Sequence, residues 1–232
     1  QAILTNYYQK RSKVPLFISM DAEWGLGMRL DSTISFPRQM TIGAIKDEHL
    51  ITEYGFAIAS QLKRLGVHMS FSPVADINNN PRNPVINIRS FGENKEDVAR
   101  KAILYMQALK AGGIFTVAKH FPGHGDTDTD SHYALPVINH SFQTIDSLEL
   151  YPFKQLIKAG VDGMMIGHMF IPAIDSAVNM PSSLSKIVIQ DLLIKKLDFK
   201  VWSSCLWVSH MDMCNRRSDS TALNSRLCNL GR

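Results

Sequence analysis

The segment Lys119–His132 holds the densest concentration of chemically able side chains in the sequence. It reads KHFPGHGDTDTDSH, with three histidines and three aspartates in fourteen residues. An aspartate two residues before a histidine, as Asp130 stands before His132, can hydrogen-bond the imidazole, select one tautomer and shift its pKa. Those are the properties of a general acid/base catalyst. The proline, glycines and threonines of the segment favour turns, so we expect a loop that carries an acid/base pair.

The same segment could instead bind a metal ion, because imidazole and carboxylate groups are common ligands. The possible ligands are His120, His124, Asp126, Asp130 and His132. None of them shows the i, i+4 histidine pairing on a helix that zinc peptidases use, and a glycine-rich segment holds ligands loosely. A solvated acidic loop with a helix cap is the structural alternative, but three histidines and three aspartates after a buried strand favour a functional role. We therefore favour acid/base chemistry and keep a metal site as the alternative.

Further polar residues follow short apolar runs, each of which has the length of a β-strand. These runs are Leu16–Met20 before Asp21, His68–Val74 before Asp76, Ile114–Ala118 before Lys119 and His120, and Gly163–Ile166 before His168. Between them, apolar residues recur with the period of a helix. The predicted helices are His49–Leu65, Glu96–Ala111, Ile145–Ala159 and a further one that begins at Ser183 or Ser185.

Alternating strands and helices predict an α/β fold with a parallel sheet, because parallel strands need a crossover and a helix supplies it. Polar residues at the strand ends favour a (β/α)8 barrel of TIM type, whose site lies at the carboxyl ends of the strands. A doubly wound sheet is the alternative, but Gly25 and Gly27 lack the third glycine of its phosphate-binding fingerprint. Four strand–helix units can be counted. We therefore expect a partial barrel, with the first unit and the last strands missing.

The composition describes a globular domain. Of the 232 residues, 45% are hydrophobic and 20% are charged, and no apolar run approaches the roughly 18 residues of a membrane span. The net charge of +4 is small and the basic residues form no stripe, so we expect no nucleic-acid partner. Residues 201–232 contain all three cysteines and half of the net charge. We expect residues 1–200 to be the barrel domain and residues 201–232 an aberrant tail, either frame-shifted or divergent.

Several segments resemble glycoside hydrolase family 3, in particular its bacterial β-N-acetylglucosaminidases. Lys119–His132 resembles the family motif K-H-F-P-G-H-G-D-T-x-x-D-S-H over its whole length. Met20–Arg29 is similar to the family's D-x-E-G-G-x-x-x-R segment, with Trp24 and Leu26 as departures. Two further blocks that resemble the family are Phe71–Asp76 and Asn87–Gly92.

This resemblance implies a retaining glycoside hydrolase that removes terminal β-linked N-acetylglucosamine from glycans such as muropeptides, with no cofactor. It implies that Asp130 and His132 are the acid/base dyad. The residues implied for sugar binding are Asp21, Arg89, Lys119 and His120, with Arg29 nearby. Apart from the resemblance, the place of His168 at the end of the fourth apolar run predicts that it lines the same pocket. The resemblance is compatible with either the bacterial cytoplasm or the cell envelope. We also expect a further domain in the intact protein.

Alternatives stay open for single residues. A buried ion pair that supports the loops is the structural alternative for Asp21 and Arg89. We expect a structural role for Asp76, and packing rather than sugar stacking for Trp24.

One departure from the family bears on activity. Family members carry their nucleophile in an F-S/T-D segment shortly after G-F-K-G, whereas Phe199 and Lys200 here are followed by VWSSCLW. The next carboxylate, Asp212, lies six residues beyond the expected place. We therefore expect a poor or inactive enzyme. Three alternatives are a phosphorylase of the same family, a metal-dependent hydrolase and a non-catalytic sugar-binding remnant.

Overall fold

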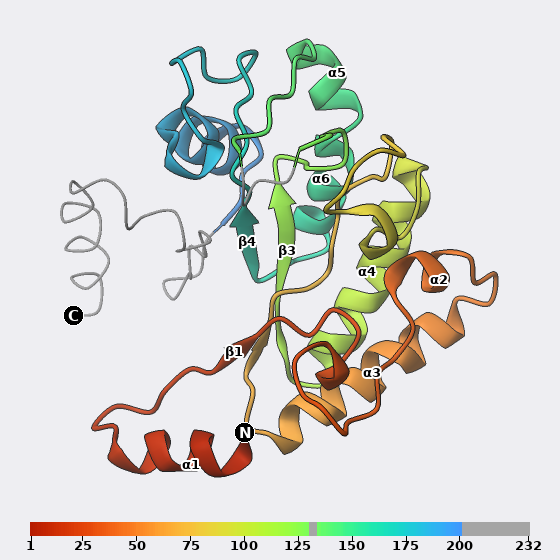
Figure 1. Cartoon of the computed structure of the whole chain (residues 1–232), viewed down its shortest axis with the longest axis vertical. Coiled ribbons are helices and arrows are strands. Elements are labelled where there is room, and N and C mark those ends of the chain that lie inside the picture. The colour runs from red at the N-terminus through yellow and green to blue at the C-terminus, as the bar shows by residue number, and fades with distance from the viewer. Residues whose placement is uncertain (130–133, 201–232) are drawn as a thin grey trace.

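A computed structural model describes residues 1–129 and 134–200 of the chain. Its centre is a parallel sheet in the order β1-β2-β3-β4, so that each strand lies beside the next one along the chain (Figure 1). The strands are β1 Ser19–Met20, β2 Met69–Ser70, β3 Phe115–Phe121 and β4 Gly163–Ile166. Each coincides with or overlaps one of the predicted apolar runs. The parallel α/β arrangement is confirmed.

Strand β3 is longer than predicted. The apolar run indicated an end at Ala118, but the strand continues through Lys119 and His120 to Phe121. The register of β3 on β4 shifts between Lys119 and Phe121, which interrupts the regular alternation of side chains between the two faces. The consecutive residues Lys119 and His120 can therefore both contribute side chains to the carboxyl end of the sheet.

Helices α3 (His49–Arg64) and α4 (Lys95–Ala111) pack against each other beside the sheet (Figure 1). Their approach is close, because a Cβ atom added to Gly55 would lie 2.5 Å from the Cβ of Ala108. Helix α4 begins after Asn94, whose side chain accepts a hydrogen bond from a backbone N–H of the first turn. Both helices agree with the predicted ranges to within one residue.

The predicted helix Ile145–Ala159 is instead two helices. They are α5 Phe142–Ser147 and α6 Leu150–Lys158. The break falls at Leu148, and Pro152 explains it. Proline has no N–H to donate to the carbonyl four residues earlier, and its ring crowds that carbonyl, which here belongs to Leu148.

The remaining helices comprise one that the sequence predicts and several that it does not. The predicted last helix is present as Ile187–Lys196, with π-type hydrogen bonds. The apolar pattern did not predict α1 (Ala2–Arg11), α2 (Gln39–Gly43) or the 3-10 helices Leu26–Met28, Asn87–Arg89 and Ser182–Leu184. Across the described chain, none of the helices has the length and apolarity needed to cross a bilayer.

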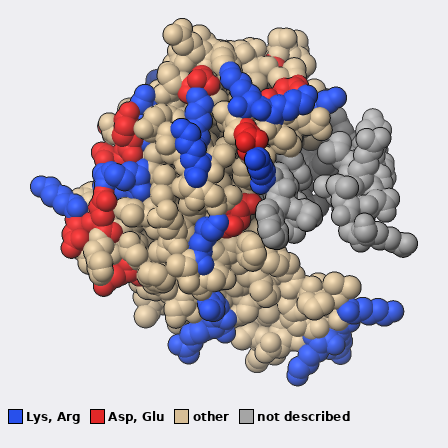
Figure 2. Space-filling model, turned by 180° about the vertical axis from the view of Figure 1, so that it is seen from behind, with Lys and Arg blue, Asp and Glu red and all other residues tan. Residues whose placement is uncertain are grey.

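The hydrophobic core fills the space between the sheet and the helices. Its large, fully buried side chains include Phe91, Tyr105, Phe121 and Phe153. Most charged side chains lie at the surface, and acidic and basic groups are interspersed over the upper part of the face in Figure 2, but a few, such as Glu23, Asp76 and Lys119, are buried. The core thus gives the strand ends a rigid support.

Candidate active site

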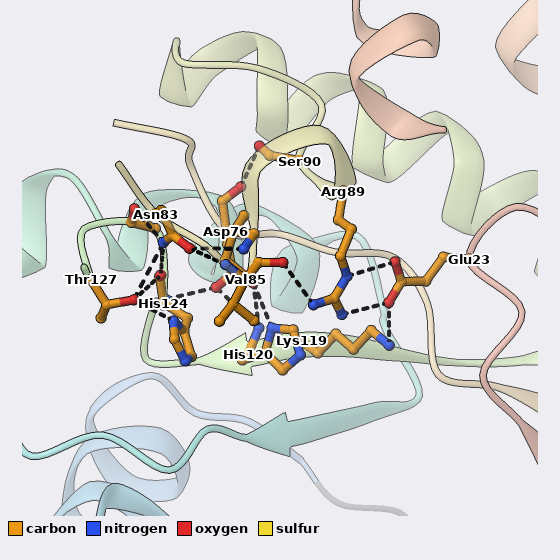
Figure 3. A network of polar contacts seen from close by, with 12 residues as sticks. Glu23, Asp76, Asn83, Val85, Arg89, Ser90, Lys119, His120, His124 and Thr127 are labelled. Atoms are coloured by element: carbon orange, nitrogen blue, oxygen red, sulfur yellow. Dashed lines mark hydrogen bonds and ion pairs between the residues drawn. The ribbon is translucent and has the colours of Figure 1, made fainter. Parts of the chain in front are cut away.

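Charged side chains from separate segments meet at the carboxyl ends of β1, β2 and β3 (Figure 3). The acidic members follow β1 and β2, and the basic members come from β3 and from a 3-10 helix. They are Asp21 and Glu23 after β1, Asp76 after β2, Arg89 at the end of Asn87–Arg89, and Lys119 and His120 within β3. This is the edge of the sheet at which the sequence predicts a site.

Lys119 is the centre of the cluster. Its ammonium nitrogen lies 2.8 Å from Asp21 Oδ1 and 2.7 Å from Glu23 Oε1. The lysine side chain is 2% exposed, and a buried ammonium group keeps its charge only when opposite charges compensate for the lost hydration. The two carboxylates that follow β1 provide that compensation.

Glu23 is fully buried and has a second basic partner. Arg89 donates to it through Nε at 3.0 Å and through Nη2 at 2.7 Å, in a bidentate contact. Burial by itself would raise the pKa of Glu23, but the charges and hydrogen bonds of Lys119 and Arg89 outweigh burial and lower it to about 2. Glu23 is therefore an anion at neutral pH.

Asp21 is the more accessible carboxylate, with 19% of its side chain exposed. The half-exposed Arg29 donates to it through Nη2 at 2.7 Å. Burial would raise the pKa of Asp21, but the charges of Lys119 and Arg29 together with their hydrogen bonds hold it below its ordinary value. A ligand that reaches this edge would meet an acceptor and a donor side by side.

Asp76 organises a second polar group, and it is fully buried. One of its oxygens lies 2.6 Å from His120 Nδ1, and the other accepts the backbone N–H of His124 at 2.7 Å. Burial would raise the pKa of Asp76, but its interactions with the two histidines lower it. Asp76 is therefore the anion that pairs with the His120 imidazole.

Burial lowers the pKa of His120; Asp76 opposes that shift, while Arg89 and Lys119 reinforce it. We assign His120 as the neutral imidazole whose Nδ1–H donates to Asp76. Its Nε2 is then an acceptor for a ligand hydroxyl group.

The turn that follows β3 is fixed from several sides. Asn83 Nδ2 donates to the carbonyls of His124 and Gly125 at 2.8 and 2.9 Å, and Thr127 Oγ1 lies 2.7 Å from His124 Nδ1. Gly125 lies so close to Ile77 that an added Cβ atom would be 1.7 Å from the Ile77 carbonyl oxygen. The first part of the predicted loop is therefore tightly packed.

His168 lies at the carboxyl end of β4, as predicted. Its Nδ1 is 2.5 Å from Ser183 Oγ. The neighbouring Gly167 packs on β3, because a Cβ atom added there would lie 3.3 Å from the Cβ of His120. The end of β4 is thus beside the Asp76–His120 pair.

The structure brings most of the predicted sugar-binding residues together. Asp21, Arg29 and Lys119 are in direct contact, and Glu23 joins Arg89 to Lys119. Asp21 pairs with Lys119 and Arg29, and Arg89 pairs with Glu23. Both residues thus lie in ion pairs that join separate segments, as the structural alternative expected, although they do not pair with each other. The predicted dyad, Asp130 and His132, lies outside the described residues.

Sequence reasoning missed Glu23 and assigned Asp76 a purely structural role. A signal for Glu23 was present, since it lies two residues after Asp21 in the segment that follows β1, and a carboxylate there can reach the same buried cation. Nothing local in the sequence indicates that Asp76 lies beneath His120, because the two are 44 residues apart.

Within residues 1–129 and 134–200, no group of three or more His, Cys, Asp or Glu side chains is arranged to hold a metal ion. The described members of the possible ligand set have other partners. His120 contacts Asp76, His124 contacts Thr127, and Asp126 forms an ion pair with His140. The other two possible ligands, Asp130 and His132, lie outside the described residues.

Comparison with known proteins identifies relatives of the chain. The model of the glycosyl hydrolase family 3 N-terminal domain matches residues 1–220. Beta-hexosaminidase A of Pseudoalteromonas piscicida is 38% identical over 207 residues, which cover 83% of this chain and 35% of that relative.

Solved structures are also similar. A family 3 beta-N-acetylglucosaminidase from Paenibacillus sp. str. FPU-7 has a TM-score of 0.81 at 41% identity, over 85% of this chain and 38% of that one. The beta-glucoside phosphorylase BglX has a TM-score of 0.80 at 30% identity, over 85% and 38%. The chain thus spans less than two-fifths of the length of these proteins. The structural likeness confirms the prediction of a partial (β/α)8 barrel.

Proposed function

Since this chain belongs to glycosyl hydrolase family 3, we propose that it acts on terminal β-linked N-acetylglucosamine, as the barrel part of a β-N-acetylhexosaminidase. The observation that carries the proposal is the buried Lys119 held between Asp21 and Glu23. This cluster lies at the carboxyl ends of parallel strands, where (β/α)8 barrels build their sites. The natural substrate that we propose is a glycan containing N-acetylglucosamine, such as a muropeptide.

The chemistry of the cluster suits a sugar. Neighbouring hydroxyl groups of a pyranose can donate to a carboxylate and accept from a cation at the same time. Asp21 and Arg29 offer such a pair of groups 2.7 Å apart at the edge of the cluster. The residues that we propose to bind the sugar are Asp21, Arg29, Arg89, Lys119 and His120, with His168 lining the pocket.

In the proposed reaction His132 protonates the glycosidic oxygen as the bond to the leaving group breaks. Asp130 orients the imidazole and favours its charged form. As that bond breaks, a carboxylate nucleophile bonds to the anomeric carbon. In the second step a water molecule attacks this carbon, displaces the carboxylate and loses its proton to His132. A retaining reaction also needs a carboxylate nucleophile, and the family segment that carries it is replaced by VWSSCLW after Lys200. We propose that this chain binds the sugar but turns it over slowly or not at all.

A phosphorylase is the second candidate, because the beta-glucoside phosphorylase BglX is among the similar structures. A histidine acid/base, unlike a carboxylate, does not repel an incoming phosphate. Reaction products separate the two activities. A phosphorylase releases sugar 1-phosphate only when phosphate is present, whereas the hydrolase that we favour releases free N-acetylglucosamine with or without it.

Calorimetric titration of the chain with N-acetylglucosamine tests the binding site. We expect saturable binding that Arg29→Ala weakens about tenfold, because the sugar loses a charged hydrogen-bond donor. Arg64→Ala is the matched control, since Arg64 is an exposed arginine at the end of α3. Absence of binding, or equal binding by the wild type and Arg29→Ala, would contradict the proposed site. Tighter binding of glucose than of N-acetylglucosamine would contradict the proposed substrate.

A further inference from the structure

We propose that Glu149 is a positioning residue of the sugar site, which supports the turn after β3 and through that turn holds Asp76 and His120 in place. The inference rests on the proposed function for its sugar ligand. Its structural part, which concerns the turn itself, does not.

Glu149 is the residue before α6, and its side chain is buried, with 1% of the residue exposed. Its Oε1 accepts a hydrogen bond of 2.6 Å from Asn79 Nδ2. Its Oε2 is buried and has no hydrogen-bond partner among the described residues. The same oxygen faces the turn, because a Cβ atom added to Gly123 would lie 2.8 Å from it.

The turn from Phe121 to Gly125 is therefore enclosed. Glu149 lies against Gly123, while the backbone of Ile77 and the side chain of Asn79 lie against Gly125. Asn79 is also hydrogen-bonded to Glu149. The Glu149 carboxyl group therefore links the residues that pack on Gly123 to those that pack on Gly125.

This turn connects Glu149 to the proposed sugar site. The backbone N–H of Gly123 donates to the carbonyl of His120 at 2.8 Å, and that of His124 donates to Asp76 at 2.7 Å. Asp76 in turn binds the His120 imidazole. A displacement of the turn would remove one hydrogen bond from Asp76 and change the orientation of His120. The Glu149 carboxyl group packs on Gly123 and bonds Asn79, and it acts on Asp76 and His120 through the turn. We therefore assign it a positioning role.

The charges around Glu149 favour its neutral form. Burial raises its pKa most, the nearby Asp76 and Asp126 raise it further, and the Asn79 hydrogen bond and His140 lower it, with a result of about 7. Below that pH the Glu149 carboxyl group is protonated, and its uncharged form can be buried at little cost in lost hydration. Above it, an anion with an unpartnered oxygen lies among like charges, and the turn is destabilised. The fraction of molecules whose site can bind the sugar should therefore decrease as the pH rises through 7.

Calorimetric titration with N-acetylglucosamine between pH 5.5 and 8.5 tests the inference on the full chain. Because apparent affinity scales with the competent fraction, we expect wild-type affinity at pH 8 to be about tenfold below that at pH 6. Glu149→Gln keeps the shape of the side chain without its charge, and should remove most of this decline. Asp162→Asn is the matched control, since Asp162 bonds Lys110 and Thr116 near the opposite ends of the strands. It should retain the wild-type pH dependence.

Hydrogen exchange separates failure of the inference from failure of the proposed function. We expect the protection factors of the Gly123 and His124 amides to fall above pH 7 in the wild type and to stay constant in Glu149→Gln. If the chain binds no N-acetylglucosamine at any pH but shows this difference, the positioning of the turn stands and the proposed function fails. If exchange and affinity depend on pH identically in the wild type and in Glu149→Gln, the inference is overturned.

Discussion

Arg89 and Glu23 are 66 residues apart in the chain, yet they form a bidentate ion pair with contacts of 3.0 and 2.7 Å. The pair joins the 3-10 helix that follows β2 to the segment that follows β1. Lys119 binds the same carboxylate from β3. Three segments are therefore fixed to one buried anion, and the side chains of the site are positioned before any ligand arrives.

Glu23→Gln should lower the free energy of unfolding by about 3–5 kcal/mol, because it leaves two buried cations without their shared anion. Urea denaturation at pH 7 measures the change. Glu53→Gln is the control, since Glu53 is largely exposed on α3, and it should stay within about 0.5 kcal/mol of the wild type. A loss for Glu23→Gln no greater than that of the control would contradict a central role for Glu23.

The pKa of Glu23 also predicts acid sensitivity. It is lowered from 4.5 to about 2, so the folded protein prefers the anion. The stabilisation is fully present above pH 4.5 and is lost as the pH falls through 2, with a total of about 3 kcal/mol. Urea denaturation between pH 2 and 6 should show a slope that is shallower in Glu23→Gln. Parallel curves for the two proteins would count against the assigned shift.

Gly125→Ala should destabilise the protein by more than about 3 kcal/mol, because its Cβ atom would lie 1.7 Å from a backbone oxygen that has little room to move. Gly160→Ala is a useful contrast. Gly160 has a φ of +81° and nothing within 4 Å of an added Cβ atom, so its cost is about 1–2 kcal/mol of backbone strain. Thermal unfolding of both variants measures the difference. A smaller loss at 125 than at 160 would show that the turn is not tightly packed.

The acid/base role of His132 predicts a dependence on the leaving group. We expect His132→Ala to depress hydrolysis of glycosides with poor leaving groups far more than that of activated aryl glycosides, because only the former need protonation. The test uses a chimera in which the segment after Lys200 comes from Beta-hexosaminidase A. Equal losses on both kinds of substrate would indicate a structural histidine.

The 232-residue chain itself should release little p-nitrophenol from the N-acetyl-β-glucosaminide. An acid/base pair alone supplies a rate enhancement on the order of 10² to 10⁴, and the family nucleophile is absent from its expected place. Asp212 is the nearest substitute in the sequence. Rapid turnover that Asp212→Asn abolishes would overturn this expectation.

The sequence patterns predicted the strands because the segments that contain them are mostly apolar until they reach the site, although β1 and β2 each include a serine. The same rule placed the end of β3 too early, since Lys119 is polar but buried by Asp21 and Glu23. The break between α5 and α6 had a local signal in Pro152, which lies four residues after Leu148. Periodicity alone passed over it, because apolar residues recur on both sides of the break.

The partners within the site were harder to predict, because they are distant in the sequence. Arg89 suggested a carboxylate partner, but the pattern gave no reason to choose Glu23 over Asp21. Likewise, the hydrogen bonds of Asp76 to His120 and His124 depend on how β2 and β3 lie side by side. Such contacts follow from the register of the sheet, which the residue types do not reveal.

Charge in the site is balanced. Its carboxylates are Asp21, Glu23 and Asp76, and its basic side chains are Arg29, Arg89 and Lys119. With three charges of each sign, and with Glu149 neutral below pH 7, the cluster exerts little net field at a distance in that range. An uncharged sugar should therefore bind with an affinity that hardly varies with ionic strength, and an anionic co-substrate would gain no long-range electrostatic steering towards this pocket.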